Sequence, residues 1–387
     1  MSFLHSKKGK KMQDFGIYVH IPFCKKKCKY CDFISFECVE EYEERYINAL
    51  INEIEDCKLN KRVSTIYFGG GTPSIISEKN IEKVLKILYE KFEIDKDAEI
   101  TLEVNPGTVN MKKLQKYKEI GINRLSIGLQ STDDSSLKML GRIHTYSEFL
   151  ETFENAKTVG FDNINVDLIL GIPNQTIDKL NVDLQNIVKL NPKHISVYSL
   201  ILEDGTELEK EIANNKLEMI SDLLERQMYW KTKKYLKKNG YEQYEISNFA
   251  QKGYESRHNM SCWNQDEYIG FGLASHSYID KTRYSNITNL EEYIKNVEEK
   301  NFNKNVIIEE KQNVEIQAKE YMMLNLRKIE GVSISKFEQK FQINPLFYFR
   351  FEIQKLTDEN LIEVDLDNIK LTNKGLDFAN LVFEEFV

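Results

Sequence analysis

The chain has 387 residues, with Lys+Arg 53 against Asp+Glu 61, which gives a formal net charge of −8 at pH 7. Hydrophobic residues make up 41% and charged residues 29%, ordinary values for a globular chain long enough to bury a sizeable core. The acidic balance argues against a broad nucleic-acid-binding surface. No apolar segment approaches the roughly 20 residues that span a bilayer.

The N-terminal sequence MSFLHSKKGKKM carries lysines but no apolar stretch of the signal-peptide type. We therefore expect residues 1–13 to form a flexible basic tail on a cytoplasmic protein. Two questions stay open from the sequence: whether these lysines touch an anionic membrane surface, and whether translation starts at Met1 or Met12.

Six short β-rich runs alternate with stretches of helical spacing in the first half of the chain. The runs are residues 16–20, 64–68, 99–104, 124–128, 164–168 and 194–200. Parallel neighbouring strands need crossover helices, so this alternation predicts an α/β fold with a parallel sheet and outer helices. Six units fall short of the eight that close a TIM barrel, so we expect a partial, TIM-like (βα)6 barrel over residues 14–205.

The alternation ends after about residue 205. Residues 206–305 combine a long helical stretch with a Gly- and aromatic-rich segment, and we expect a mixed helical and β extension there. Residues 306–387 contain short helices followed by the two-strand ribbon NLIEVDLDNIKLT, which predicts a small α+β domain of the winged-helix type. Such modules often bind DNA, but this one is not basic enough to indicate that function.

Three cysteines lie close together directly after the first predicted strand, in HIPFCKKKCKYCDF. Cys24, Cys28 and Cys31 can hold three irons of a cubane cluster and leave the fourth iron open to another ligand. The lysines between them are expected to lower the pKa of the thiols. Two alternatives complete the site with a protein ligand: His20 in a zinc site, or Cys38 as a fourth thiolate.

The segment GGGTP follows the second predicted strand. Successive glycines let the backbone approach a ligand closely and offer peptide groups to it. A Walker loop is disfavoured because no Gly-Lys-Ser/Thr follows. The alternative is a plain turn between a strand and a helix.

The spacing C-x3-C-x2-C, with Tyr30 just before the third cysteine and GGGTP after the second strand, resembles the radical S-adenosylmethionine (SAM) superfamily. The resemblance implies a 4Fe–4S cluster on the three cysteines. It also implies that the amino and carboxylate groups of SAM bind the open iron, and that a reducing electron cleaves SAM to methionine and a 5′-deoxyadenosyl radical.

Further motifs occur in order over nearly the whole chain: YVHIPFC, FGGGTPS, LEVNPG, LSIGLQS, LGRIH and NVDLILGIPNQT. They resemble the group of oxygen-independent coproporphyrinogen III dehydrogenases and the related HemW heme chaperones, including the C-terminal domain of HemN type. The residues that this resemblance places in contact with SAM are Tyr18, Tyr30, Gly70, Gly71, Thr72, Glu103, Gln130, Arg142 and Asp167. An arginine suits the carboxylate of SAM, and the two acidic residues suit its ribose hydroxyls or amino group.

Two features separate the branches of this group. The dehydrogenases resemble C-x3-C-x2-C-x-C and carry a long N-terminal extension, whereas here Phe33 takes the place of the extra cysteine and 17 residues precede Tyr18. Both features favour the heme-chaperone branch, which binds heme and delivers it to hemoproteins such as respiratory oxidases. The alternative is the dehydrogenase, which forms protoporphyrinogen IX in porphyrin biosynthesis, so the sequence leaves enzyme activity open.

The chaperone branch also resembles H-N-x-x-Y-W in its C-terminal half. Here RHNMSCW supplies His258 as the expected heme ligand, with Cys262 in place of the tyrosine and as an alternative ligand. A radical SAM enzyme that modifies tRNA is disfavoured by the acidic charge. We expect heme-accepting hemoproteins and a small tetrapyrrole as partners and no nucleic acid, while a homodimer is left open.

Overall fold

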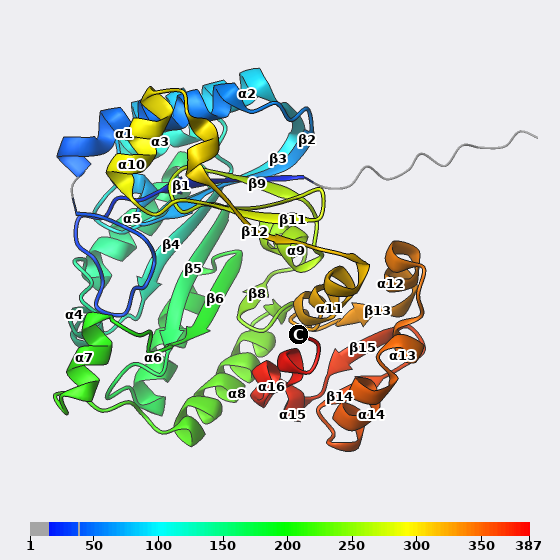
Figure 1. Ribbon diagram of the computed structural model, residues 1–387. Coiled ribbons are helices and arrows are strands. Elements are labelled where there is room, and N and C mark those ends of the chain that lie inside the picture. The colour runs from blue at the N-terminus through cyan, green and yellow to red at the C-terminus, as the bar shows by residue number, and fades with distance from the viewer. Residues whose placement is uncertain (1–14, 38) are drawn as a thin grey trace, which may run out of the picture.

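The computed structural model describes residues 15–37 and 39–387, so the expected basic tail and Cys38 lie outside the described residues. A large twisted sheet lies at the centre, with helices on its outer side, and the C-terminal segment forms a separate small unit beside it (Figure 1). Among the described helices, none is both long and apolar enough to cross a membrane.

The six predicted strands are present and lie side by side in chain order, all parallel. They are β1 (Gly16–Ile21), β2 (Arg62–Gly70), β3 (Glu93–Val104), β4 (Arg124–Gln130), β5 (Asn163–Leu170) and β6 (His194–Ser199). The segments between them contain α1 (Val39–Asp56), the 3-10 turn η1 (Pro73–Ile75), α2 (Glu78–Lys91), α3 (Met111–Glu119), α4 (Asp134–Met139), α5 (Tyr146–Val159) and α6 (Ile177–Leu190). The predicted α/β fold with a partial barrel is confirmed.

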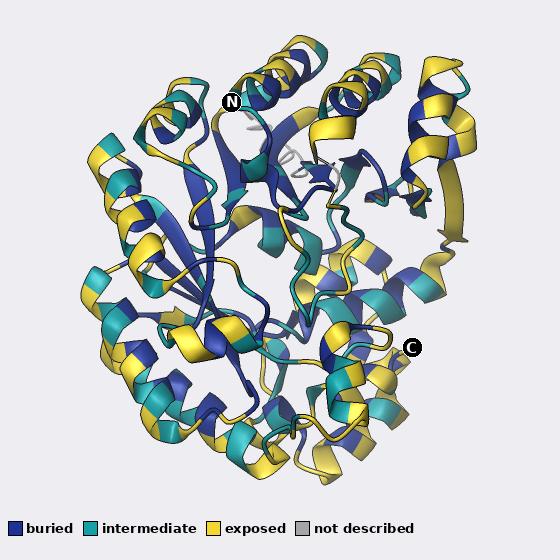
Figure 2. Cartoon of the chain, turned by 90° about the vertical axis from the view of Figure 1, so that its left-hand side faces the viewer, coloured by how far each residue is buried: buried dark blue, intermediate teal, exposed yellow. Residues whose placement is uncertain are grey.

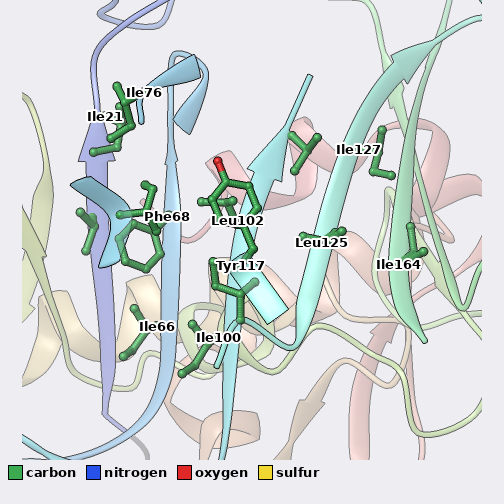
Figure 3. Close-up of a cluster of buried hydrophobic side chains, with 14 of the residues drawn as sticks. Ile21, Ile66, Phe68, Ile76, Ile100, Leu102, Tyr117, Leu125, Ile127 and Ile164 are labelled. Atoms are coloured by element: carbon green, nitrogen blue, oxygen red, sulfur yellow. The ribbon is translucent and has the colours of Figure 1, made fainter. Parts of the chain in front are cut away.

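The two faces of this sheet differ in chemistry, because successive side chains on a strand point to opposite faces. The outward side chains are apolar and pack under the helices, as Ile66, Phe68, Leu102, Leu125 and Ile164 do in Figure 3. The inward side chains of the same strands are largely polar. Figure 2 shows the buried strands behind a ring of helices whose outer faces are exposed.

Local signals in the sequence explain where the helices begin and end. Helix α5 starts with a capping box, in which the Thr145 backbone N–H donates to the Glu148 carboxylate at 2.7 Å and the Thr145 hydroxyl accepts from the Glu148 N–H. It ends at Gly160, whose φ of 97° lies in the left-handed region that glycine adopts without strain.

The second half of the chain extends the sheet on both sides, which the sequence did not predict. Strand β9 (Tyr268–Phe271) pairs parallel with β1, and β10 (His276–Ile279), β11 (Thr282–Asn286) and β12 (Val306–Lys311) follow as antiparallel neighbours. On the other side β8 (Asn248–Ala250) pairs with β6, and β7 (Glu242–Gln243) pairs with β8. The result is a 12-stranded sheet.

The helices of this middle region are α7 (Glu207–Ala213), α8 (Asp222–Lys238), α9 (Arg257–Trp263), α10 (Leu290–Glu298) and the 3-10 turn η2 (Phe302–Asn305). Helix α8 contacts the small C-terminal unit: the Trp230 indole N–H donates to Asp377 at 2.8 Å, and Arg226 pairs with the same carboxylate at 3.5 Å.

The C-terminal unit has its own hydrophobic core, which begins at Ala318. Its elements are α11 (Val314–Asn325), β13 (Val332–Ser333), α12 (Ile334–Phe341), α13 (Pro345–Tyr348), α14 (Arg350–Asp358), β14 (Ile362–Val364), β15 (Asn368–Leu371), α15 (Asn373–Asp377) and α16 (Ala379–Glu384). Short helices followed by a hairpin agree with the predicted winged-helix type of domain. Strand β12, which begins at Val306, pairs with β11 in the large sheet.

A half-buried carboxylate on α1 fastens the sheet extension to the barrel. Glu53 accepts hydrogen bonds from the Asn286 amide at 2.6 Å, the Gly272 backbone N–H at 2.7 Å and the Tyr293 hydroxyl at 2.6 Å. Burial raises the pKa of this carboxyl, and the three donors partly offset that effect. One side chain therefore connects the residue that follows β9, strand β11 and helix α10 to the first helix.

We expect Glu53→Ala to lower the free energy of unfolding by about 2–3 kcal/mol, because it leaves three donors without their acceptor. Urea unfolding monitored by circular dichroism measures this change. Glu55→Ala, on the exposed side of the same helix, is the matched control and should change stability by less than about 0.5 kcal/mol. Equal unfolding midpoints for the two variants would contradict the role of Glu53.

Candidate functional site

The three clustered cysteines lie on a loop that leaves the carboxyl end of β1 and is closed by backbone hydrogen bonds. The Cys24 N–H donates to the Phe36 carbonyl at 2.9 Å, and the Phe36 N–H donates to the Pro22 carbonyl at 2.7 Å. Inside the loop, the Cys31 N–H donates to the Cys28 carbonyl at 3.2 Å. Cys24 is buried, while the other two cysteines are half-buried and reach the cavity described below.

The glycine-rich segment after β2 packs directly under this loop. The Gly71 N–H donates to the Ile21 carbonyl at 2.9 Å, and the Thr72 N–H donates to the Phe23 carbonyl at 2.7 Å. A Cβ at position 71 would lie 2.7 Å from the Phe23 carbonyl oxygen and 2.9 Å from the Cys24 Sγ. Such contacts are not tolerated, so the position of the cysteine loop requires glycine here.

The protonation of the thiols differs from the expectation drawn from the lysines. Burial raises the pKa of the Cys24 thiol, and it raises the pKa of the Cys31 thiol to about 11, against a smaller lowering effect of Lys27. Lys29 instead pairs with Glu207 and Glu211 of α7, at 3.1 and 2.5 Å. The expectation of lowered thiol pKa values is therefore wrong for these two cysteines. Binding of iron would have to displace their protons.

Arg142 lies between the cysteine loop and the carboxyl end of β4. Its Nη1 is 3.5 Å from the Cys28 Sγ, and its Nη2 donates to the Asn105 Oδ1 at 2.5 Å and to the Gly128 carbonyl at 2.7 Å. Its Nε is buried and has no partner among the described residues. The guanidinium is therefore largely committed to holding the loop, with one donor left for a further acceptor.

Asn105 is a site residue that the sequence analysis did not single out. Its amide donates to the Thr72 hydroxyl at 2.9 Å while its carbonyl accepts from Arg142, so it joins the glycine-rich segment to the guanidinium. The available signal was its place in the quoted LEVNPG segment, immediately after the third strand.

Two carboxyl groups face the interior of the barrel from neighbouring parts of the sheet. Glu103 accepts a hydrogen bond from the Tyr67 hydroxyl at 2.8 Å, and Asp167 accepts from the Ser126 hydroxyl at 3.2 Å and the Asn165 amide at 2.7 Å. Burial raises the pKa of Asp167 and raises that of Glu103 to about 7. Glu103 thus changes charge near neutral pH.

Gln130 ends β4 in an unusual backbone conformation. Its φ is 73°, and the pairing of β4 with β5 is irregular at this point. Its side-chain Oε1 is buried and has no partner among the described residues. A strained polar residue with an unsatisfied acceptor is typical of a position that serves a ligand.

A cavity of about 450 Å³ brings these groups together at the carboxyl ends of the strands. It is lined by all three cysteines and by every residue expected to contact SAM except Tyr18. Three thiols, an unsatisfied acceptor on Gln130, an unsatisfied donor on Arg142 and a glycine surface beneath the loop form a donor set that fits an iron–sulfur cluster with a small polar ligand.

Tyr18 lies in a second cavity, of about 910 Å³, next to the first. Its ring stacks on Tyr67 with centroids 6.3 Å apart, and its hydroxyl is 3.1 Å from the His20 Nδ1. This cavity is bounded by β1, by residues 32–34 of the cysteine loop and by the added strands β9 to β12. The two cavities share Asp32, Phe33, Gly70 and Glu103 in their walls.

His258 and Cys262, the two expected heme ligands, both line the second cavity. The His258 Nδ1 is 2.9 Å from the Thr65 hydroxyl, and its ring stacks on Tyr67 with centroids 5.1 Å apart. Burial lowers the pKa of His258 to about 4 and raises that of the Cys262 thiol to about 12. The imidazole is therefore neutral, and the thiol is a weak ligand at neutral pH.

Of the two alternatives for a protein ligand that completes the metal site, His20 lies within the described residues and Cys38 does not. Both ring nitrogens of His20 are engaged, Nδ1 with the Tyr18 hydroxyl and Nε2 at 3.1 Å from the Ile34 carbonyl, and the ring faces the second cavity. Within residues 15–37 and 39–387, no three Cys, His, Asp or Glu side chains converge on a point suited to one metal ion. In a cubane cluster each thiolate binds a different iron, so such convergence is not needed.

Comparison with known proteins agrees with this site. Residues 18–186 match the model of the radical SAM superfamily, and residues 314–378 match that of the HemN C-terminal domain. Coproporphyrinogen III oxidase (HemN) from Escherichia coli superposes with a TM-score of 0.84 at 24% identity, over 97% of this chain and 90% of that one. The fold and the cysteine loop together define a radical SAM protein.

Relatives of higher identity extend over nearly the whole chain. The heme chaperone HemW of Lactococcus lactis is 35% identical, covering 96% of both chains, and HemW of Bacillus subtilis is 35% identical over 96% of this chain and 98% of its own. The HemW of Escherichia coli is 34% identical over 70% of this chain. Within the radical SAM superfamily, the chain belongs to the HemW family.

The contact between Gly71 and the cysteine loop gives a direct test of the cluster site. We expect Gly71→Ala to weaken cluster retention by about tenfold or more, because the new Cβ displaces Cys24. Iron, sulfide and the visible absorbance of the cluster, measured after anaerobic reconstitution and gel filtration, report this loss.

Gly69→Ala is the matched control, because the three atoms nearest its Cβ would be side-chain atoms of Tyr18, Tyr67 and Glu103, none of them in the cysteine loop. This variant should keep its iron and sulfide. Full cluster content in the Gly71→Ala protein would show that the loop does not depend on the close approach.

Proposed function

We propose that the chain is a radical SAM heme chaperone. In this proposal a 4Fe–4S cluster and SAM occupy the 450 Å³ cavity, heme occupies the 910 Å³ cavity, and heme is delivered to hemoproteins such as respiratory oxidases. The cluster supplies an open iron for SAM and reductive chemistry. The protein residues hold, orient and charge-balance these groups.

The residues of the first cavity support the binding of cluster and SAM. Three thiols face one cavity, and Arg142 and Gln130 each keep a buried polar atom without a partner among the described residues. Glu103 and Asp167 offer acceptors for cationic or hydroxyl groups. Tyr30 lies against Leu140, Ile169 and Ile172 and offers a flat face in the same cavity.

The charge of the second cavity is the observation that carries the heme assignment. Among the described residues that line it are four carboxyl groups, on Asp32, Glu103, Glu292 and Glu309, and neither lysine nor arginine. Its volume suits a small-molecule ligand. An acidic wall repels anionic groups, so a bound tetrapyrrole must direct its carboxylates away from it.

Heme and coproporphyrinogen III differ in the number and placement of their carboxylates. Heme carries two propionates on neighbouring rings, so one edge can point to solvent while the apolar edges enter the cavity. Coproporphyrinogen III carries a propionate on each of its four rings, so any orientation places carboxylates against the acidic wall. The lining of the cavity therefore favours heme as cargo over coproporphyrinogen as substrate.

Phe33 also favours the chaperone. It stands where the dehydrogenases carry an extra cysteine, the residue is 64% exposed, and it lines both cavities. An exposed aromatic ring is suited to contact with an apolar macrocycle. Phe33 thus connects the cavity proposed for the cluster and SAM with the cavity proposed for heme. In this proposal, cluster and SAM in the first cavity act as a switch for heme in the second.

The deciding experiment is anaerobic incubation of the reconstituted protein with reductant, SAM and either heme or coproporphyrinogen III. The chaperone proposal predicts a Soret band from tightly bound heme and no protoporphyrinogen IX. Stoichiometric formation of protoporphyrinogen IX with 5′-deoxyadenosine would establish the dehydrogenase instead.

Glu103 makes the binding of SAM dependent on pH. Its pKa is about 7, raised by burial and by Asp167 and lowered by Tyr67 and Arg124, so it gains its charge as pH rises from 6 to 8. The charged form destabilises the folded protein, since the unfolded carboxyl ionises at lower pH, but it attracts the cationic groups of SAM. We expect SAM affinity to rise by up to about tenfold over this range.

Equilibrium dialysis of SAM against the reconstituted protein at each pH measures this effect. Glu103→Gln keeps the shape and the acceptor oxygen but not the charge, so its SAM affinity should be low and flat with pH. The same pH dependence in the variant and the wild type would remove Glu103 from the SAM site.

A further inference from the structure

The histidines in the wall of the 910 Å³ cavity differ in what their rings already contact. The two ring nitrogens of His20 are engaged by Tyr18 and by the Ile34 carbonyl. The residue His258 is 6% exposed, and its ring lies against Tyr67. A heme that binds iron through an imidazole needs open space for the macrocycle on every side of that nitrogen, and these two rings are enclosed by their neighbours.

The packing around His258 shows how little space it has. A Cβ at Gly16 would lie 3.4 Å from its Nδ1 and Cε1, so the ring is close to the backbone of β1. The backbone N–H of His258 donates to Glu99 at 3.1 Å, which fixes the start of α9 against β3. His258 is thereby held as part of the cavity wall, in a stack that includes Tyr67, the hydrogen-bond partner of Glu103.

His276 is the third histidine in this wall and differs from the other two. It is the first residue of β10, its side chain is exposed, and it lines the same cavity. Across the described part of the chain, His20, His144, His194 and His258 all have ring hydrogen bonds, whereas none is formed by the His276 ring. Its ring nitrogens are available to a ligand.

The backbone that carries His276 is held firmly. A Cβ at Gly270 would lie 2.3 Å from the His276 carbonyl oxygen, so a glycine is needed for the close approach of β9 to β10. The Gly270 N–H donates to the Ser277 hydroxyl at 2.9 Å, and His276 pairs with Ser285 of β11. A fixed backbone with an unengaged side chain provides a pre-organised ligand.

Apolar groups beside His276 suit a macrocycle. Ile287, Ile307 and Phe33 line the cavity together with His276, and Ile307 and Phe33 are 45% and 64% exposed. Glu309, on the same strand as Ile307, is held by the Ser285 hydroxyl. The cavity that His276 lines therefore combines apolar side chains with carboxylates.

We propose that His276, rather than the motif residue His258, is the axial ligand of the heme iron in this cavity. The lone pair of a neutral imidazole nitrogen forms the bond to iron, and neither the iron nor the ring is oxidised or reduced in that step. His258 acts as a positioning residue in the wall. This assignment rests on the proposed heme-binding function.

The test is titration of the full-length, cluster-reconstituted protein with hemin, followed through the Soret band. His276→Ala should weaken heme binding by about tenfold or more and shift the Soret band, and added imidazole should restore the wild-type spectrum. His276→Cys should give the spectrum of thiolate-ligated heme. His258→Ala should keep the wild-type ligand spectrum, with circular dichroism checking that both alanine variants are folded.

The outcomes separate the assignment from the function on which it rests. If the wild-type protein binds no heme, both the proposed function and the assignment fail. If the wild type binds heme and His276→Ala gives the same affinity and spectrum, the assignment alone fails. Loss of the ligand spectrum in folded His258→Ala, with its retention in His276→Ala, would return the ligand role to His258.

Discussion

The polar inner face of the parallel sheet is the constraint on which the rest of the structure depends. A buried polar group without a partner is costly, so each inward side chain must find another group. His194 illustrates this: its Nδ1 is 2.6 Å from the Asn165 Oδ1, and its Nε2 is 2.8 Å from the Tyr244 hydroxyl, which belongs to the middle region. The segments that follow the barrel supply such partners at the end where the parallel strands begin.

Pairing on this face is nevertheless incomplete: the Thr101 Oγ1 and the Arg124 Nε have no partner among the described residues, and the same holds at the carboxyl ends of the strands. Gln130 and Arg142 keep buried atoms without partners among the described residues, while Glu103 and Asp167 are carboxyls in surroundings that disfavour charge. The free-energy cost of these unpaired atoms and buried carboxyls is offset only when a ligand with complementary groups binds. The segments that follow the barrel thus pair part of this interior, while the cavity at the carboxyl ends of the strands keeps groups that a ligand can pair.

Much of this arrangement was predictable because it depends on short-range pattern. The alternation of β-rich and helical stretches predicted six parallel strands. Most residues expected at the site lie at or after the ends of these strands, and they line the first cavity. Tyr18 was expected to contact SAM together with residues of that cavity, but it lines the second cavity, whose far wall is formed by added strands that pair over long sequence distances. Short strands such as β9 and β10 carry too few residues for a clear pattern.

Other features depend on burial, which residue spacing does not show. The lysines beside the cysteines predicted lowered thiol pKa values, yet burial dominates for Cys24 and Cys31. The motif pointed to His258, but only the three-dimensional packing reveals that its ring is enclosed while that of His276 is not. Asn105 gained its importance from two partners that lie 33 and 37 positions away along the chain.

Strand β12 has a consequence for how copies of this chain behave at high concentration. It is the outermost strand of the 12-stranded sheet, every residue in it is exposed, and it begins with Val306, Ile307 and Ile308. Unpaired backbone groups along an apolar edge invite edge-to-edge growth with other chains. The charges of Glu309, Glu310 and Lys311 oppose that growth, and since salt screens them, the tendency of this edge to recruit further strands should increase with ionic strength.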